Sequence, residues 1–172
     1  MTEQSIDRLE AQRAFVRALR RSSRLAQAAL EKTLSKFQLN YGQWTALRIV
    51  VAANEISVGD LSREAEMTSG AMTRLVDCLE ERGLVQRYRS DTDRRQVKVL
   101  STPAAAKAVH AIVPFLTTAW SSLLSEMSTD EIAELTAHLF QFAETLETRS
   151  NQRLPSDVDE FANASVLKRM TG

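Results

Sequence analysis

The feature that most limits the fold is a segment near the N-terminus, residues 6–37, which contains neither glycine nor proline. Its apolar residues recur in steps of three, four or seven, a spacing that predicts one long amphipathic helix. These residues are Leu9, Val16, Leu19, Ala26, Leu30, Leu34 and Phe37. Such a helix would extend for roughly 48 Å, longer than a small domain is wide. A surface helix with a solvated basic face is one interpretation, and dimerisation through the apolar stripe is the one we favour.

Three shorter helices are predicted to follow, over about 43–53, 57–66 and 71–82. Ser57 and Asp60 resemble a capping box that opens the middle helix, and Gly83 stands where a helix commonly ends in a left-handed residue. The last helix has an apolar stripe of Met72, Leu75, Val76 and Leu79. Two helices joined by a short turn, with one polar face left exposed, are typical of a helix-turn-helix.

Two β-prone runs come next, at residues 84–88 and 96–100, and a polar, charged stretch lies between them. This pattern predicts a β-hairpin with a long basic tip. A charged hairpin tip is usually just solvated. Directly after a helix-turn-helix, however, we interpret it as the wing of a winged helix.

The C-terminal third is predicted to be helical again. Apolar spacing continues on both sides of Pro114, so that this proline should kink the helix without ending it. Ser128 and Glu131 form a capping box for a last helix, and the periodicity fades after Thr148. The expected fold is mainly α. Its segments are a dimerisation helix (1–38), a winged helix-turn-helix lobe with a small β-hairpin (39–101), two dimerisation helices (102–149) and a mobile tail (150–172).

Charge is segregated along a chain whose net charge is zero. Residues 8–36 carry +6, residues 82–98 carry +4 and residues 126–160 carry −7. One surface can therefore be basic although the whole is neutral, which suits a nucleic-acid partner. The single cysteine, the absence of a signal peptide and the lack of a long apolar run favour a cytoplasmic protein without a membrane partner.

Three motifs resemble the MarR family (multiple antibiotic resistance regulators). They are residues 67–77 (MTSGAMTRLVD), residues 79–85 (LEERGLV) and residues 91–95 (DTDRR), in the family's order. The resemblance covers about residues 10–148 and implies a homodimer that regulates transcription, most often as a repressor, by binding palindromic double-stranded DNA. It also implies release by small aromatic or phenolic ligands or by oxidants. One departure is Ala105, where the family often has glycine, and the segment beyond residue 150 has no counterpart.

Candidate DNA contacts lie at the start of the predicted recognition helix and in the wing. Hydroxyls and free N–H groups near a helix start suit phosphates, small residues allow close approach to the major groove, and arginines reach base edges or a narrow minor groove. The candidates are Thr68, Ser69, Gly70, Ala71, Thr73, Arg74, Arg89, Asp93, Arg94 and Arg95. Thr68 and Ser69 have an alternative role as plain N-caps. Asp93 is expected to brace Arg95.

A small-molecule pocket is expected where the dimerisation helices meet the DNA-binding lobe. Its candidate residues are Trp44, Arg17, Arg20, Arg24 and His110, although a tryptophan such as Trp44 is more often part of a core. Cys78 is interpreted as a buried, inert thiol in preference to a redox sensor. No phosphate loop, nucleophile elbow or metal-ligand spacing is present, so neither an enzyme nor a cofactor is expected. The alternative function is a winged-helix module whose basic wing binds an acidic protein partner.

Overall fold

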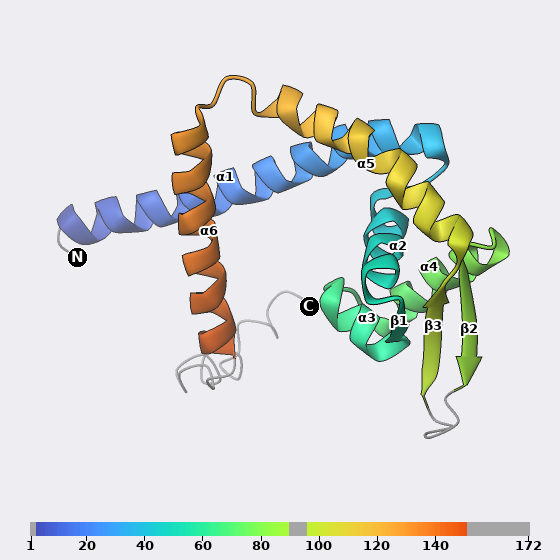
Figure 1. Cartoon of the computed structure of the whole chain (residues 1–172). Helices are drawn as coiled ribbons and strands as arrows, with labels where there is room; N and C mark the ends of the chain where they lie inside the picture. The colour runs from blue at the N-terminus through green and yellow to red at the C-terminus, as the bar shows by residue number, and fades with distance from the viewer. Residues whose placement is uncertain (1–2, 90–95, 151–172) are drawn as a thin grey trace, which may run out of the picture. The chain divides into compact units, whose positions relative to one another are not determined.

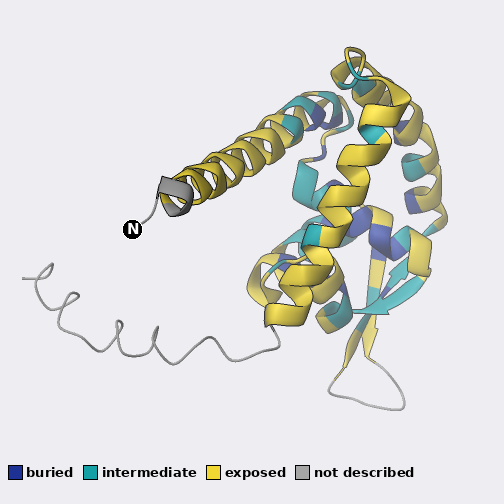
Figure 2. Cartoon of the chain, turned by 90° about the vertical axis from the view of Figure 1, so that its left-hand side faces the viewer, coloured by how far each residue is buried: buried dark blue, intermediate teal, exposed yellow. Residues whose placement is uncertain are grey.

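The computed structural model describes residues 3–89 and 96–150, and it begins with the predicted long helix, α1 (Glu3–Leu34). The helix ends three residues earlier than expected, because Ser35–Phe37 forms a 3-10 turn, η1, and Gln38 adopts a left-handed conformation with φ of 56°. Leu30 and Leu34 are buried, whereas every residue from 6 to 25 is exposed (Figure 2). Only the C-terminal end of α1 thus belongs to the core of this chain.

Helix α2 (Tyr41–Ala53) lies at the centre of the core and contacts α1, α4 and α5. It begins two residues before the predicted start, because the side chain of Asn40 accepts a hydrogen bond from the Gln43 N–H and the Gln43 side chain accepts one from the Asn40 N–H. This capping box satisfies two backbone donors that a helix start would otherwise leave free. Every residue of α2 that is fully buried is hydrophobic: Trp44, Ala46, Leu47, Ile49 and Val50.

The helix-turn-helix consists of α3 (Val58–Glu64) and α4 (Ser69–Glu81). Ser57 caps α3 by accepting from the Asp60 N–H at 3.0 Å, as the sequence predicted. Helix α3 ends two residues before the expected boundary, where Glu66 turns the chain with φ of 53°. Helix α4 begins two residues before its predicted start and ends one residue before its predicted end, whereas Gly83 is left-handed with φ of 66°, as predicted.

The sheet has three antiparallel strands in the order β1-β3-β2. They are β1 (Glu55–Ser57), β2 (Val85–Arg89) and β3 (Val97–Ser101). The hairpin strands are therefore shifted by one residue from the predicted runs. Val99, which is fully buried, pairs with Ile56 on one side and with Arg87 on the other, and so the central strand anchors the hairpin beside α3 (Figure 1).

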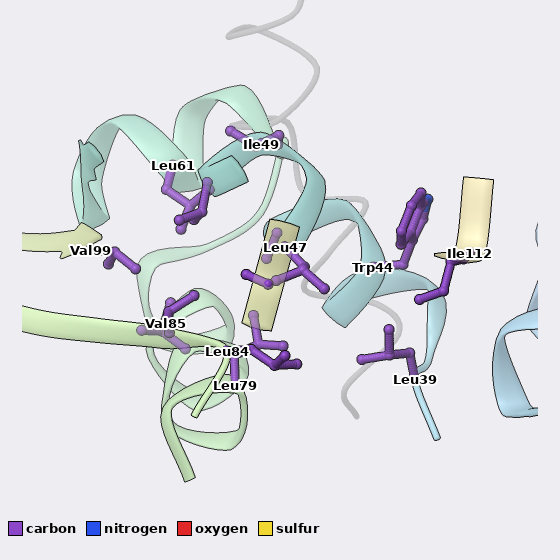
Figure 3. Packing of buried hydrophobic residues seen from close by; sticks show 14 of the residues in the cluster. Leu39, Trp44, Leu47, Ile49, Leu61, Leu79, Leu84, Val85, Val99 and Ile112 are labelled. Carbon is purple, nitrogen blue, oxygen red and sulfur yellow. The ribbon is translucent and has the colours of Figure 1, made fainter. Parts of the chain in front are cut away.

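Helix α5 (Pro103–Leu123) continues through Pro114 as predicted and contacts α1 and α2. Thr102 caps α5 through its hydroxyl, which accepts from the Ala105 N–H at 3.2 Å. Ala105 itself is completely buried, so its methyl group fills space in the core that glycine would leave empty. Figure 3 shows the same core around Leu47, Leu79 and Ile112.

The chain divides into two compact units, Met1–Leu123 and Leu124–Gly172. The second unit contains α6 (Thr129–Ser150), which opens at the predicted capping box of Ser128 and Glu131. The winged-helix lobe thus shares its unit with α1 and α5.

Candidate nucleic-acid interface

The start of α4 presents a continuous exposed strip of small and polar side chains. Met72, Val76 and Leu79 on the opposite side of this helix are fully buried in the core. Because a helix repeats every 3.6 residues, burying that side forces the other outward. The predicted contacts Thr68, Ser69, Gly70, Ala71, Thr73 and Arg74 are all exposed. The structure therefore brings together six of the ten predicted DNA-contacting residues.

The hydroxyl groups in this strip are used in different ways. Thr68 is the N-cap of α4, since its Oγ1 accepts from the Ala71 N–H at 3.3 Å, and the alternative role predicted for it is confirmed. Thr73 donates its hydroxyl to the Ser69 carbonyl at 2.8 Å. Within the described parts of the chain, Ser69 Oγ and the Arg74 guanidinium have no partner, which leaves both groups open to an external ligand.

Gly70 borders open space. A Cβ atom added there would meet nothing within 4 Å, and the residue does not have a left-handed backbone. None of the residues that the structure describes therefore requires glycine at this position. The lack of a side chain matters only to a molecule that approaches α4 from outside.

The wing contributes one described candidate, Arg89, which is exposed at the end of β2. Asp93, Arg94 and Arg95 lie outside the described residues, so the proposed support of Arg95 by Asp93 stays a prediction.

Two cations of the basic hairpin are bound internally, and both pairings were missed by the sequence analysis. The Arg87 guanidinium contacts Asp77 and Glu80 of α4, while Lys98 Nζ contacts Glu55 of β1. The backbone N–H of Arg87 and then its side chain hold the pKa of Glu80 below its usual value. The Lys98 ammonium, followed by the Tyr88 hydroxyl, similarly lowers the pKa of Glu55. The sequence did contain a signal for the Arg87 pairing, because Asp77 and Glu80 lie three residues apart on the recognition helix.

A hollow of about 490 Å³ lies between α3, the start of α4 and the hairpin. It is lined by Ser57, Val58, Gly59, Asp60, Arg63, Thr73, Arg87, Gln96 and Val97. None of the residues predicted for an effector pocket lines this hollow.

The predicted effector residues lie on three different helices, α1, α2 and α5. Trp44 is only 7% exposed and packs in the core, as its alternative interpretation held. Arg17, Arg20 and Arg24 are exposed on α1, and His110 is exposed on α5. Arg17 borders a shallow hollow on α1 that Leu9, Gln12, Arg13 and Val16 complete.

The prediction that the Cys78 thiol is buried is wrong. The residue is half-buried, and its Sγ accepts a hydrogen bond from Gln43 Nε2 at 2.9 Å, because α2 packs across this face of α4.

No group of histidine, cysteine and carboxylate side chains suited to a metal ion occurs among the residues whose placement is described. In the same residues, no helix combines the length and the apolar character needed to cross a bilayer.

Residues 39–97 match the sequence model of the MarR family. The organic hydroperoxide resistance transcriptional regulator of Bacillus subtilis (strain 168) is 25% identical over 148 residues, which cover 86% of this chain and 99% of that protein. The HTH-type transcriptional regulator MgrA of Staphylococcus aureus is 28% identical over 106 residues, which cover 60% of this chain and 69% of the relative.

Solved structures with the same fold include a mutant of Escherichia coli MarR complexed with operator DNA. The similarity has a TM-score of 0.71 at 23% identity and covers 75% of this chain and 93% of that one. Bordetella bronchiseptica BpsR, whose DNA binding is regulated by 6-hydroxynicotinic acid, gives a TM-score of 0.70 at 21% identity and covers 76% and 98% of the two chains.

Proposed function

Because the chain belongs to the MarR family and has the family's winged-helix fold, we propose that it is a DNA-binding transcriptional regulator acting as a homodimeric repressor on a palindromic operator. The observation that carries the proposal is the exposed strip of α4 from Thr68 to Arg74, held rigid by the buried side of the same helix. The strip belongs to the recognition helix, and the hairpin, the second DNA-reading element of a winged helix, packs against the same helix.

The strip has the chemistry that a DNA duplex requires. Ser69 and the first N–H groups of α4 suit phosphate oxygens, because the positive end of the helix dipole favours an anion there. Gly70 and Ala71 let the helix approach the bases closely, and Arg74 is long enough to reach a guanine edge or a phosphate. We assign Arg89, Arg94 and Arg95 of the wing to contacts with the DNA backbone and the minor groove next to the recognition helix.

A homodimer accounts for the exposed apolar side of α1. Ile6, Leu9, Phe15, Val16, Leu19 and Leu25 are each more than one-third exposed in the isolated chain. Within the second unit, α6 likewise exposes Leu135, Leu139, Phe140 and Leu146. Such a large apolar surface is unusual for a monomer and marks an interaction site. A two-fold dimer then places two recognition helices on half-sites about one helical turn, roughly 10 bp, apart.

We assign a small aromatic acid as the effector. The support is the BpsR structure, which concerns regulation by 6-hydroxynicotinic acid, together with the cationic surface of α1. Arg17, Arg20, Arg24, Trp44 and His110 stay the predicted pocket. Because the three arginines lie on the exposed part of α1, we expect the partner subunit to complete this pocket.

The test begins with selection of duplexes from a random-sequence library by the wild-type chain, followed by titration at two salt concentrations. A palindromic consensus and an affinity that falls as salt rises support the proposal. Selection of no duplex, together with binding to an acidic polypeptide, would replace it with the protein-interaction alternative. Sedimentation equilibrium should show a dimer at micromolar concentration, and a stable folded monomer would contradict the dimer. A thermal-shift screen of aromatic acids addresses the effector.

A further inference from the structure

One arginine joins the wing strand to the recognition helix. Arg87 lies in the middle of β2, and its side chain is only 22% exposed. Its Nε donates to Glu80 Oε2 at 2.9 Å, its backbone N–H donates to Glu80 Oε1 at 2.9 Å, and a terminal guanidinium nitrogen contacts Asp77. Asp77 and Glu80 lie three residues apart on α4, and so they present their carboxylates side by side.

The charge balance of this cluster argues against a direct role in DNA contact. Two carboxylates compensate one guanidinium, so a phosphate would have to compete with two bonds already made inside the protein. By contrast, the guanidinium of Arg74 has no partner in the described residues. Arginine is suited to the cluster because its planar fork matches two acceptors at once, which a lysine ammonium does not.

The next residue of β2 is anchored as well. Successive side chains of a strand point to opposite faces, and Tyr88 accordingly contacts Glu55 of β1, which also binds Lys98 of β3. Strand β2 is thus tied to α4 through Arg87 and to β1 through Tyr88.

We infer that Arg87 is a positioning residue, which holds the wing strand β2 and the recognition helix α4 as one rigid body and makes no contact with DNA itself. A hairpin fixed in this way before binding loses less conformational freedom when it meets the duplex. The inference rests on the proposed function, because the rigid body is useful only if both elements read the same DNA.

Removal of the two carboxylates gives the sharpest test, because direct contact and positioning predict opposite signs. Asp77→Asn and Glu80→Gln each remove a negative charge close to the expected phosphates, so if Arg87 contacted DNA they would strengthen binding. If Arg87 is a positioning residue, each should weaken binding to the duplex selected by the wild type by about three- to tenfold, the size of a partly exposed charged hydrogen bond. Glu81→Gln, an exposed acid on the same helix, is the control and should not weaken binding. Wild-type or tighter binding by both carboxylate variants would overturn the inference.

Substitutions of Arg87 supply a second readout. Arg87→Lys retains the positive charge but loses the planar guanidinium that binds two carboxylates at once. If Arg87 is a positioning residue, this variant should therefore bind DNA nearly as weakly as Arg87→Gln. A direct phosphate contact would instead be rescued by lysine, and Arg87→Gln alone would lower the salt slope by about one unit. In addition, Glu80→Gln combined with Arg87→Gln should bind no more weakly than Arg87→Gln, because both changes break the same link. Thermal melts establish that each variant is folded at the assay temperature.

Hydrogen exchange in the absence of DNA separates this inference from the proposed function. We expect the amides of β2 to exchange about tenfold faster in Glu80→Gln and Arg87→Gln than in the wild type, while amides of α2 are unchanged. Unchanged exchange in β2 would show that Arg87 does not hold the strand and would overturn the inference. If the wild type selects no duplex, the proposed function fails, and exchange still decides whether Arg87 joins the two elements.

Discussion

Gln43 of α2 donates a hydrogen bond from its side-chain amide to Cys78 Sγ of α4, with nitrogen and sulfur 2.9 Å apart. The other end of the same amide, Oε1, accepts from the Asn40 N–H in the capping box of α2. One glutamine therefore links the start of the central core helix to the recognition helix, and it gives the thiol a structural role.

We predict that Cys78→Ser retains DNA binding and leaves the response to peroxide unchanged, because serine also accepts this hydrogen bond. Cys78→Ala should lower the free energy of unfolding by about 1 kcal/mol, since it leaves the Gln43 amide without its acceptor. DNA titrations with and without peroxide, together with denaturant unfolding, measure both effects. A wild type that responds to peroxide beside a Cys78→Ser variant that does not would reveal an oxidant sensor.

Gly70→Ala should separate stability from DNA binding. The added methyl group meets no other described part of the chain within 4 Å, and alanine favours a helix over glycine, so the free energy of unfolding should stay the same or rise by up to about 1 kcal/mol. In the complex the methyl group would press against the duplex and weaken binding by about 1–3 kcal/mol. Wild-type affinity in this variant would show that α4 does not approach DNA closely at Gly70.

Arg74→Ala should weaken binding by about 1–3 kcal/mol if the side chain reads a base, or lower the salt slope by about one unit if it binds a phosphate. The matched control is Arg48→Ala, which removes an exposed arginine from α2. Titration of both variants at several salt concentrations distinguishes the two cases. Equal behaviour of the two variants would remove Arg74 from the interface.

In the wing, Arg95→Ala should weaken specific binding by about 1–3 kcal/mol, and Arg94→Ala should weaken it less. The reason is the sequence DTDRR at residues 91–95, in which Asp93 is expected to aim the arginine two residues further on. A wing tip contributes little to a core, so the Tm should hardly change. Binding of Arg95→Ala as tight as that of the wild type would reduce the wing to a solvated hairpin.

The pH dependence of stability should report the ion pair at the base of the sheet. Lys98, followed by Tyr88, holds the pKa of Glu55 below its usual value of 4.5. The stabilisation is therefore complete above about pH 4.5, the pKa of the unfolded chain, and is lost as pH falls through the lower pKa of the folded state. Glu55→Gln should accordingly lower the Tm at pH 7 and match the wild type in strong acid. A Tm difference that is constant from pH 7 to pH 3 would contradict this assignment.

Local sequence signals were sufficient for most of the secondary structure and for part of the interface. The N-cap at Ser57, the capping box at Ser128 and the helix end at Gly83 each involve atoms only a few residues apart. The exposed strip of α4 followed from the 3.6-residue period of its apolar side. The capping box at Asn40 had the same local character and was overlooked, which displaced the predicted start of α2.

What the sequence by itself determined is the winged helix-turn-helix with its long flanking helices, because helical periodicity, caps and turns depend on near neighbours in the chain. Only the tertiary structure decided which cations stay available to a ligand. Arg87 meets Glu80 and Asp77 because β2 packs against α4, and Lys98 meets Glu55 across two strands that lie more than forty residues apart in sequence. Charge counted along the chain cannot show such pairings, because ionic contacts depend on distances in space that strand register and helix packing set.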